Sequence, residues 1–202
     1  MLTINYNQFT QKKETRQLRN NRLKMMIVTA LFAAIIGIMA QITIPLPLVP
    51  ITGQTLAIGL AATILGKKYG TLSVIVYIML GIAGLPVFSG MSSGLGVVFG
   101  PTGGYIIGFL PAAFIIGWIL ERFGFTVTTA IIANIIGMII TLTFGAIWLK
   151  YVAEISWMAA LSGGVVPFII VGIIKAVLAA TVGILVRNRL TSAKLLPISF
   201  AN

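Results

Sequence analysis

Apolar residues fill six stretches of the chain, separated by short segments that contain proline, glycine or basic residues. A helix crosses the hydrocarbon core of a bilayer with roughly 20 apolar residues, within a range of about 17–25. The pattern therefore predicts an all-α integral membrane protein with about six transmembrane helices. The expected spans are residues 25–42, 52–65, 69–84, 104–120, 127–149 and 164–186.

Two of these stretches allow a second interpretation. Residues 25–42 follow a basic segment, as the apolar part of a signal peptide does, but the chain there lacks a small-x-small cleavage site and stays apolar beyond it. Residues 52–65 are few enough to form a re-entrant or tilted element instead of a full crossing. We expect three regions: a basic N-terminal segment, 1–24; a six-helix transmembrane domain, 25–186; and a C-terminal tail, 187–202.

Composition and charge placement support a membrane protein and orient it. Hydrophobic residues make up 58% of the chain, charged residues only 8%, and the net charge is +11. Two of the three expected outer loops, 43–51 and 85–103, have no charged residue, and the last holds only Lys150 and Glu154, whereas the first span follows a basic cluster. Because cytoplasmic segments are enriched in Lys and Arg, both termini are expected in the cytoplasm, with the cluster facing anionic lipid and not nucleic acid. The cluster comprises Lys12, Lys13, Arg16, Arg19, Arg22 and Lys24.

The chain offers few groups for catalysis. It has no cysteine and no histidine, and its only acids, Glu14, Glu121 and Glu154, lie outside the apolar runs. General acid–base or metal chemistry inside the membrane would therefore have almost no groups to use. A phosphate-binding GK[ST] loop is also missing from the sequence. We expect no enzymatic activity, no metal and no cofactor.

Lys175 points to a ligand. It interrupts the last apolar run, where an unpaired charge costs about 2.5–3.5 kcal/mol or more, and no acid lies within that run. Snorkelling is difficult because Lys175 lies about 16 Å from either end of the span at 1.5 Å per residue. A lysine made neutral by desolvation is the alternative. The favoured interpretation is that a small anionic ligand supplies the missing charge.

The two uncharged outer loops are expected to cover a pocket. Pro45, Pro47 and Pro50 favour an extended path in the first loop, and the second is rich in glycine yet apolar. Apolar irregular backbone persists at membrane depth only where protein or a cavity covers it. The alternative is that both loops are short interfacial turns.

Several local patterns each have two interpretations. In GPTGGY, Gly103 and Gly104 expose backbone N–H groups at a helix start, which suits an anion, or they permit close helix packing. Gln54 contacts a ligand or satisfies the loop backbone, and Asn134 is expected to form an interhelical hydrogen bond. Small residues serve packing within the chain or docking of another subunit. They lie at Ala30 and Ala34, at Ala33 and Gly37, and at Ala176, Ala179, Ala180 and Gly183.

The motifs in combination resemble one family. PLVPITGQTLA, LGKKYGTLSVIVYIMLGIAGLPVFSG, GPTGGYIIGF and PFIIVGIIKA occur in this order over about residues 23–186. The chain is similar to the BioY family, the biotin-binding S components of energy-coupling-factor (ECF) transporters. The resemblance implies a six-helix S-component bundle, a biotin pocket that opens outward, and uptake driven by a transmembrane T subunit and two ATPases. A subunit for another small anionic vitamin, or a structural membrane partner without a ligand, remains the alternative.

The resemblance also assigns residues. The lysine of the family's last helix corresponds to Lys175, the loop glutamine to Gln54, and the alanines that contact the T subunit to Ala30 and Ala34. Ser92 lies closest to a position where members have asparagine. Gly103, Gly104 and Tyr105 of GPTGGY complete the expected substrate site. One departure stands out: the family usually has aspartate three residues before the lysine, and this chain has Gly172.

Overall fold

The computed structural model describes residues 2–193 and 195–196. It is almost entirely helical, as expected, with one two-stranded hairpin. The elements are α1 (Leu2–Ala40), β1 (Thr43–Ile44), β2 (Ile51–Thr52), α2 (Gln54–Ile82), the 3-10 turn η1 (Ser89–Met91), α3 (Leu95–Phe99), α4 (Gly103–Phe123), α5 (Val127–Val152), α6 (Trp157–Gly164) and α7 (Val166–Ser192).

Five helical segments in the described residues are long and apolar enough to cross a membrane, and one of them, α2, is broken in its interior. Within α2, Gly66 has a φ of 76° and a ψ of −174°, which breaks the helix. The Gln54 side chain in the first half donates a hydrogen bond to Tyr77 Oη in the second half at 2.5 Å, which shows that the two halves fold back on each other. The break falls in the predicted gap between the second and third spans. The first half, residues 54–65, is only about 18 Å long at 1.5 Å per residue, as its short apolar run indicated.

The outer helices extend beyond the predicted spans. Helix α1 begins at Leu2 and not at residue 25, because nothing in the first 36 residues is proline or glycine and the helix continues through the basic segment. Helix α7 likewise continues to Ser192, past the expected end at residue 186. The short helix α6 was not expected. The Ser156 side chain caps it by accepting a hydrogen bond from the Ala159 amide at 3.2 Å.

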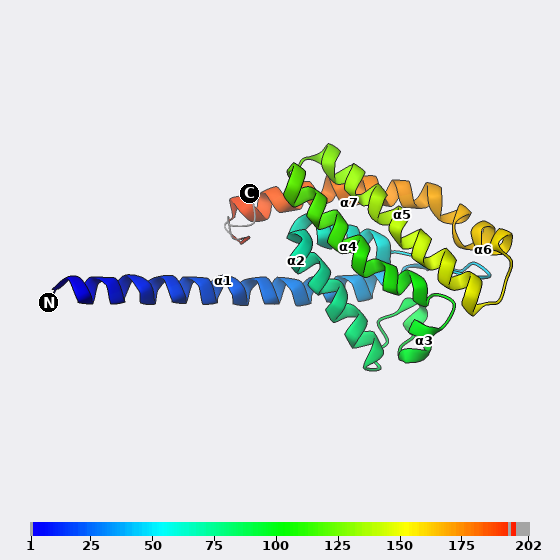
Figure 1. Cartoon of the computed structure of the whole chain (residues 1–202), viewed down its shortest axis with the longest axis horizontal. Coiled ribbons are helices and arrows are strands. Elements are labelled where there is room, and N and C mark those ends of the chain that lie inside the picture. The colour runs from blue at the N-terminus through cyan, green and yellow to red at the C-terminus, as the bar shows by residue number, and fades with distance from the viewer. Residues whose placement is uncertain (1, 194, 197–202) are drawn as a thin grey trace.

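The bundle has two distinct ends (Figure 1). The start of α1 and the end of α7 lie toward one end, and α3 and α6 lie at the other. The β1–β2 hairpin pairs Thr43 with Thr52 and Ile44 with Ile51, which confirms the extended path expected from the prolines. The hairpin and the segment around η1 and α3 form two loops, called here the first loop (residues 43–52) and the second loop (residues 85–102).

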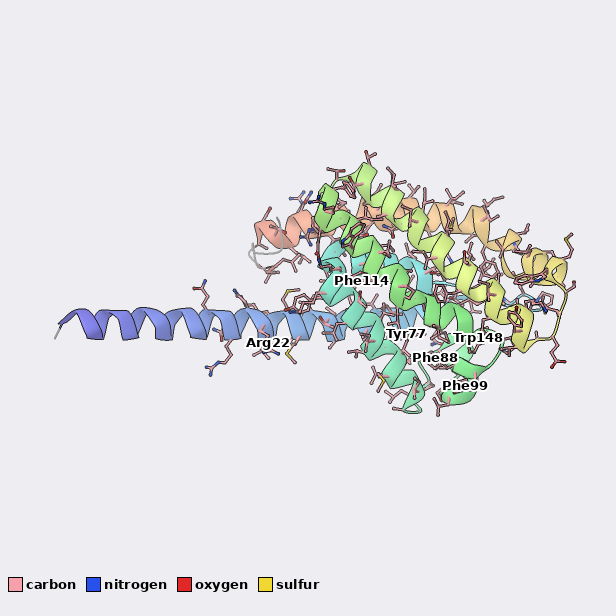
Figure 2. The ribbon with its side chains drawn as sticks, in the orientation of Figure 1. Arg22, Tyr77, Phe88, Phe99, Phe114 and Trp148 are labelled. Carbon is pink, nitrogen blue, oxygen red and sulfur yellow. The ribbon has the colours of Figure 1, made fainter. Side chains whose placement is uncertain are left out.

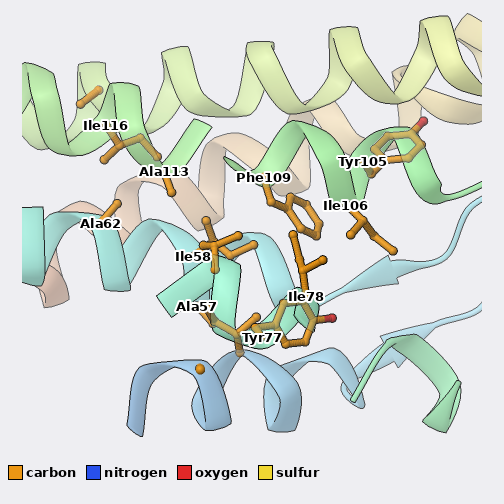
Figure 3. Packing of buried hydrophobic residues seen from close by; sticks show 14 of the residues in the cluster. Ala57, Ile58, Ala62, Tyr77, Ile78, Tyr105, Ile106, Phe109, Ala113 and Ile116 are labelled. Carbon is orange, nitrogen blue, oxygen red and sulfur yellow. The ribbon is translucent and has the colours of Figure 1, made fainter. Parts of the chain in front are cut away.

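Small residues allow the helices to approach closely around the buried core (Figure 3). An added Cβ at Gly104 would lie 2.1 Å from Trp148 Cβ, so α4 packs directly on α5. An added Cβ at Gly183 would lie 2.7 Å from Thr63, so α7 packs on the first half of α2. The predicted small-residue face of α7 therefore serves packing within the chain. All four of its members, Ala176, Ala179, Ala180 and Gly183, are buried.

Candidate functional site

The first and second loops cover a cavity of about 150 Å³, called here the outer chamber. Val49, Pro50 and Thr52 of the first loop line it on one side. Phe88 is fully buried at its wall, which shows that the second loop folds inward as its apolar sequence predicted. The interpretation as simple interfacial turns is thereby wrong. The second loop contributes Phe88, Ser89, Ser92, Val97 and Thr102 to the lining.

A smaller cavity of about 50 Å³, the inner chamber, adjoins the outer one between α2, α4, α5 and α7. Its walls are mainly apolar, with Ile58, Ile116, Met138 and Val171 among them. Together the chambers provide an apolar space with a few polar groups, which is the usual character of a small-molecule site. Residues that line both chambers are Thr55, Phe109, Thr141, Leu142, Phe168 and Lys175.

Lys175 lies where the two chambers meet. Its Nζ donates to the Thr52 carbonyl oxygen at 2.6 Å and lies 3.4 Å from Thr55 Oγ1. Lys67 and Glu121 form an ion pair at 3.1 Å, and no ion pair is found between Lys175 and a carboxylate of the described residues. The ammonium group is therefore bound to neutral oxygens of the first loop and α2, beside space that an anion can enter.

Gln54 lines the outer chamber but is already held by protein groups. Its Nε2 donates to Tyr77 Oη, and its Oε1 accepts from Thr52 Oγ1 at 2.7 Å. These bonds fix the start of α2 against the first loop and the second half of α2. Gln54 therefore forms hydrogen bonds that hold the first loop, as one of its two interpretations expected. It also lines the outer chamber, where a ligand can reach it.

The GPTGGY motif divides between packing and lining. Gly103 and Gly104 lie outside both lining sets, and an added Cβ at Gly103 would clash with the Val98 carbonyl oxygen. Tyr105 lines the outer chamber and its hydroxyl donates to the Gly164 carbonyl oxygen at 2.7 Å. The Trp148 indole donates to the Gly100 carbonyl oxygen at 3.0 Å. The glycines thus serve close packing, which positions Tyr105.

Two further sequence candidates lie at the inner chamber. Asn134 donates to Thr63 Oγ1 at 3.0 Å and to the Ala130 carbonyl oxygen at 2.8 Å, which confirms the predicted interhelical hydrogen bond. Gly172 lines this chamber too, and an added Cβ would lie 2.4 Å from Met138 Sδ. The Met138 thioether therefore occupies the space beside Gly172 that a side chain there would need.

Sequence reasoning missed most of the lining residues. Thr55 and Thr141 are polar residues inside apolar runs, and that signal was available. Phe109 and Phe168 had no such signal, because aromatic residues in apolar runs are equally common in lipid-facing and core positions. Their place at the cavity depends on which helix faces meet.

Helix α1 presents two different small-residue faces. Ala33 and Gly37 are buried, and an added Cβ at Gly37 would lie 3.3 Å from Val87. Ala30 and Ala34 are exposed, and the exposed part of α1 also carries large apolar side chains. These are Leu23, Met26, Ile27, Leu31 and Ile38.

Comparison with known proteins gives a consistent result. The sequence profile of the BioY family matches residues 10–192. A biotin transporter BioY2 from Lactococcus lactis subsp. cremoris is 40% identical over 167 residues, which cover 83% of this chain and 92% of the relative. A biotin transporter BioY from Thermotoga maritima is 40% identical over 163 residues, with coverages of 80% and 95%.

The fold also matches a solved structure. The crystal structure at 2.1 Å of the S-component for biotin from an ECF-type ABC transporter superimposes with a TM-score of 0.77 and 33% sequence identity. The match covers 84% of this chain and 93% of that one.

Proposed function

This chain belongs to the BioY family, and from that premise we propose that it is the S component that captures biotin for an ECF transporter. It is a membrane-embedded binding subunit for biotin uptake and not an enzyme. The observation that carries the assignment within this chain is the cavity under the two loops, with the Lys175 ammonium at its centre and no described carboxylate beside it.

Lys175 is proposed to bind the carboxylate of biotin. An ammonium group donates three hydrogen bonds, and two of them have neutral oxygen partners on Thr52 and Thr55. A carboxylate that enters the chamber adds a charge-assisted hydrogen bond, which is stronger than a bond to a neutral oxygen. Gln54, Ser92 and Tyr105 line the same chamber and are proposed to orient the ligand, with Gly103 and Gly104 holding the helix start beside them.

The remaining partners are proposed from the family assignment. The sequence lacks a Walker motif, so the energy for transport must come from two ATPase subunits acting through a transmembrane T subunit. The exposed Ala30 and Ala34 suit docking of that T subunit, because small residues let helix backbones approach closely. Both termini are proposed to lie on the cytoplasmic side of the bacterial membrane, at the end of the bundle from which α1 projects.

Direct ligand binding tests this function. Purified chain in lipid nanodiscs is titrated with biotin and, in parallel, with other anionic vitamins such as pantothenate and folate. We expect biotin to bind at least about a hundredfold more tightly than the others, or ~2.7 kcal/mol. Tight binding of a different vitamin would support the alternative S component, and no binding of any would support the purely structural partner.

A further inference from the structure

Gln41 joins the end of α1 to the second loop through two hydrogen bonds, and a third fixes its side chain to α1. It follows Ala40, the last residue of α1. Its Nε2 donates to the Gly37 carbonyl oxygen at 3.0 Å and to the Phe88 carbonyl oxygen at 3.0 Å. Its Oε1 accepts from the Met91 amide at 2.9 Å. One half-buried side chain therefore holds both ends of the turn from Phe88 to Met91.

This turn forms one wall of the outer chamber. Phe88, Ser89 and Ser92 line the chamber, and Phe88 and Ser92 pair across the turn, with the Phe88 amide donating to the Ser92 carbonyl oxygen at 3.0 Å. The Ser92 hydroxyl donates to the Ser89 carbonyl oxygen at 2.7 Å. The orientation of the wall thus depends on how the turn is fixed to the rest of the protein.

The backbone of the turn needs such support. Gly90 has a φ of 65° and Met91 a φ of 58°, and a residue with a side chain rarely adopts the left-handed conformation. Met91 is also exposed, so packing does not hold it in place. The bond from the Met91 amide to Gln41 holds the left-handed residue itself, and the bonds between Phe88 and Ser92 and between Ser92 and Ser89 close the turn around it.

The wall continues into the remainder of the site. The Phe88 ring meets the Tyr77 ring edge-on, with centroids 5.6 Å apart. Figure 2 labels both residues. Tyr77 Oη accepts a hydrogen bond from Gln54, and Gln54 accepts one from the Thr52 hydroxyl. The carbonyl oxygen of Thr52 in turn accepts a hydrogen bond from Lys175. These contacts connect the position of Phe88 to the polar groups around Lys175.

We propose that Gln41 is a positioning residue for ligand binding: it holds the Phe88–Ser92 turn as a preformed wall of the biotin cavity. The inference rests on the proposed function of that cavity. Holding the wall before the ligand arrives reduces the ordering that binding must supply and therefore raises the affinity. Differences in affinity between variants of one site appear mostly in the dissociation rate, so this rate is the quantity to measure. Gln41 itself does not line either chamber.

The experiment compares two substitutions at Gln41 with a control on the same helix. Gln41→Met keeps the length and removes all three hydrogen bonds. Gln41→Glu keeps the acceptor for the Met91 amide and removes both donated bonds. Thr29→Val is the control, because Thr29 is buried and its hydroxyl donates only within α1, to the Met25 carbonyl oxygen at 2.7 Å.

Three quantities are measured on the full chain in nanodiscs: the biotin dissociation rate, the unfolding temperature without biotin, and amide hydrogen exchange of residues 86–93. We expect Gln41→Met to release biotin at least about tenfold faster, or ~1.4 kcal/mol. We expect its 86–93 segment to exchange faster while the unfolding temperature stays near that of Thr29→Val. Gln41→Glu should also release biotin faster but keep the Met91 amide protected.

Unchanged biotin release in Gln41→Met overturns the inference. An equal loss of biotin binding in Gln41→Met and Thr29→Val, together with equal drops in unfolding temperature, also overturns it, since that result reports general destabilisation. Failure of the unsubstituted chain to bind biotin overturns the proposed function itself. The unsubstituted chain is measured in every series, so this outcome is distinguished from a failure of the Gln41 inference alone.

Discussion

Lys175 is the residue whose environment most directly explains the site. Its ammonium lies inside the bundle, where it donates a hydrogen bond to the Thr52 carbonyl oxygen and lies near Thr55. No described carboxylate forms an ion pair with it. A partly desolvated charge with only neutral partners retains a strong attraction for an anion, because the surrounding dielectric constant is low. Lys175 is therefore the side chain that we propose gives the cavity its affinity for a carboxylate ligand.

Replacing this side chain should weaken binding selectively. We expect Lys175→Ala to raise the biotin dissociation constant at least about tenfold, or ~1.4 kcal/mol. Lys150→Ala is the matched control, because Lys150 lies over the Tyr151 ring and outside both chambers. Isothermal titration of the purified variants gives the comparison. An unchanged dissociation constant in Lys175→Ala would remove the lysine from the site.

Because this chain has Gly172 and not aspartate, its affinity should depend more strongly on the charge of the ligand. In a chain with aspartate at this position, an acid three residues before the lysine lies on the same helix face and partly neutralises it. We expect Gly172→Asp to narrow the difference in affinity between biotin and biotin amide. The new side chain requires the flexible Met138 thioether to move, so the variant is expected to fold.

Both ligands are titrated against both proteins, because the aspartate also adds a contact of its own. Equal affinity of the unsubstituted chain for biotin and its amide would show that Lys175 does not hold the carboxylate.

At the scale of elements, α1 has one small-residue face that packs within the chain and another that is exposed to a partner. The Ala33 and Gly37 face packs inward, and Gln41 at its end holds the second loop. Ala30 and Ala34 lie on the exposed part of the same helix. A partner that binds there can therefore do so without entering the ligand cavity.

Bulky substitutions on the exposed face should block assembly alone. We expect Ala30→Trp or Ala34→Trp to leave biotin affinity within about twofold and to reduce co-purification of a T subunit at least about tenfold, because an indole prevents close helix approach. Ile174→Trp, at an exposed position on α7, is the control for adding a ring to a lipid-facing surface. Normal T-subunit recovery with both alanine variants would place the docking face elsewhere.

At the scale of the whole molecule, basic side chains collect at one end. Lys67 lies at the break in α2, Arg122 at the end of α4 and Arg189 near the end of α7, on the side from which α1 projects. At the opposite end, the first and second loops cover the outer chamber and have no charged residue, and the connection between α5 and α6 contains only Glu154, with Lys150 in the last turn of α5. By the positive-inside rule, this asymmetry supports the proposed orientation, with the basic end on the cytoplasmic side and the outer chamber toward the outer side.

Single cysteines test this orientation, since the natural chain has none. In intact cells, a membrane-impermeant maleimide should label Ser162→Cys and leave Lys68→Cys, Arg122→Cys and Arg189→Cys unlabelled until the cells are opened. All four positions are exposed in the structure. The cysteine-free parent is the control, and labelling of Arg189→Cys in intact cells would reverse the proposed orientation.

The sequence by itself determined the membrane class, the approximate spans, the break near Gly66, the asymmetric charge and the unpaired Lys175. Each of these depends on local run length or on the identity of a single residue, and needs no knowledge of neighbours in space. It also carried the motifs that indicated the family. The helical continuation of α1 back to Leu2 followed the same local rule, though the expected span began only at residue 25.

Only the tertiary structure decided which side chains meet. It placed Gly103 and Gly104 in helix packing and not in the lining, and it buried Ala33 while leaving Ala30 exposed. It also brought Gln41 to Phe88 and Met91, residues 47 and 50 positions away. These outcomes depend on how helix faces and loops pack against each other. A periodic pattern of apolar residues does not specify that packing when both lipid and core are apolar.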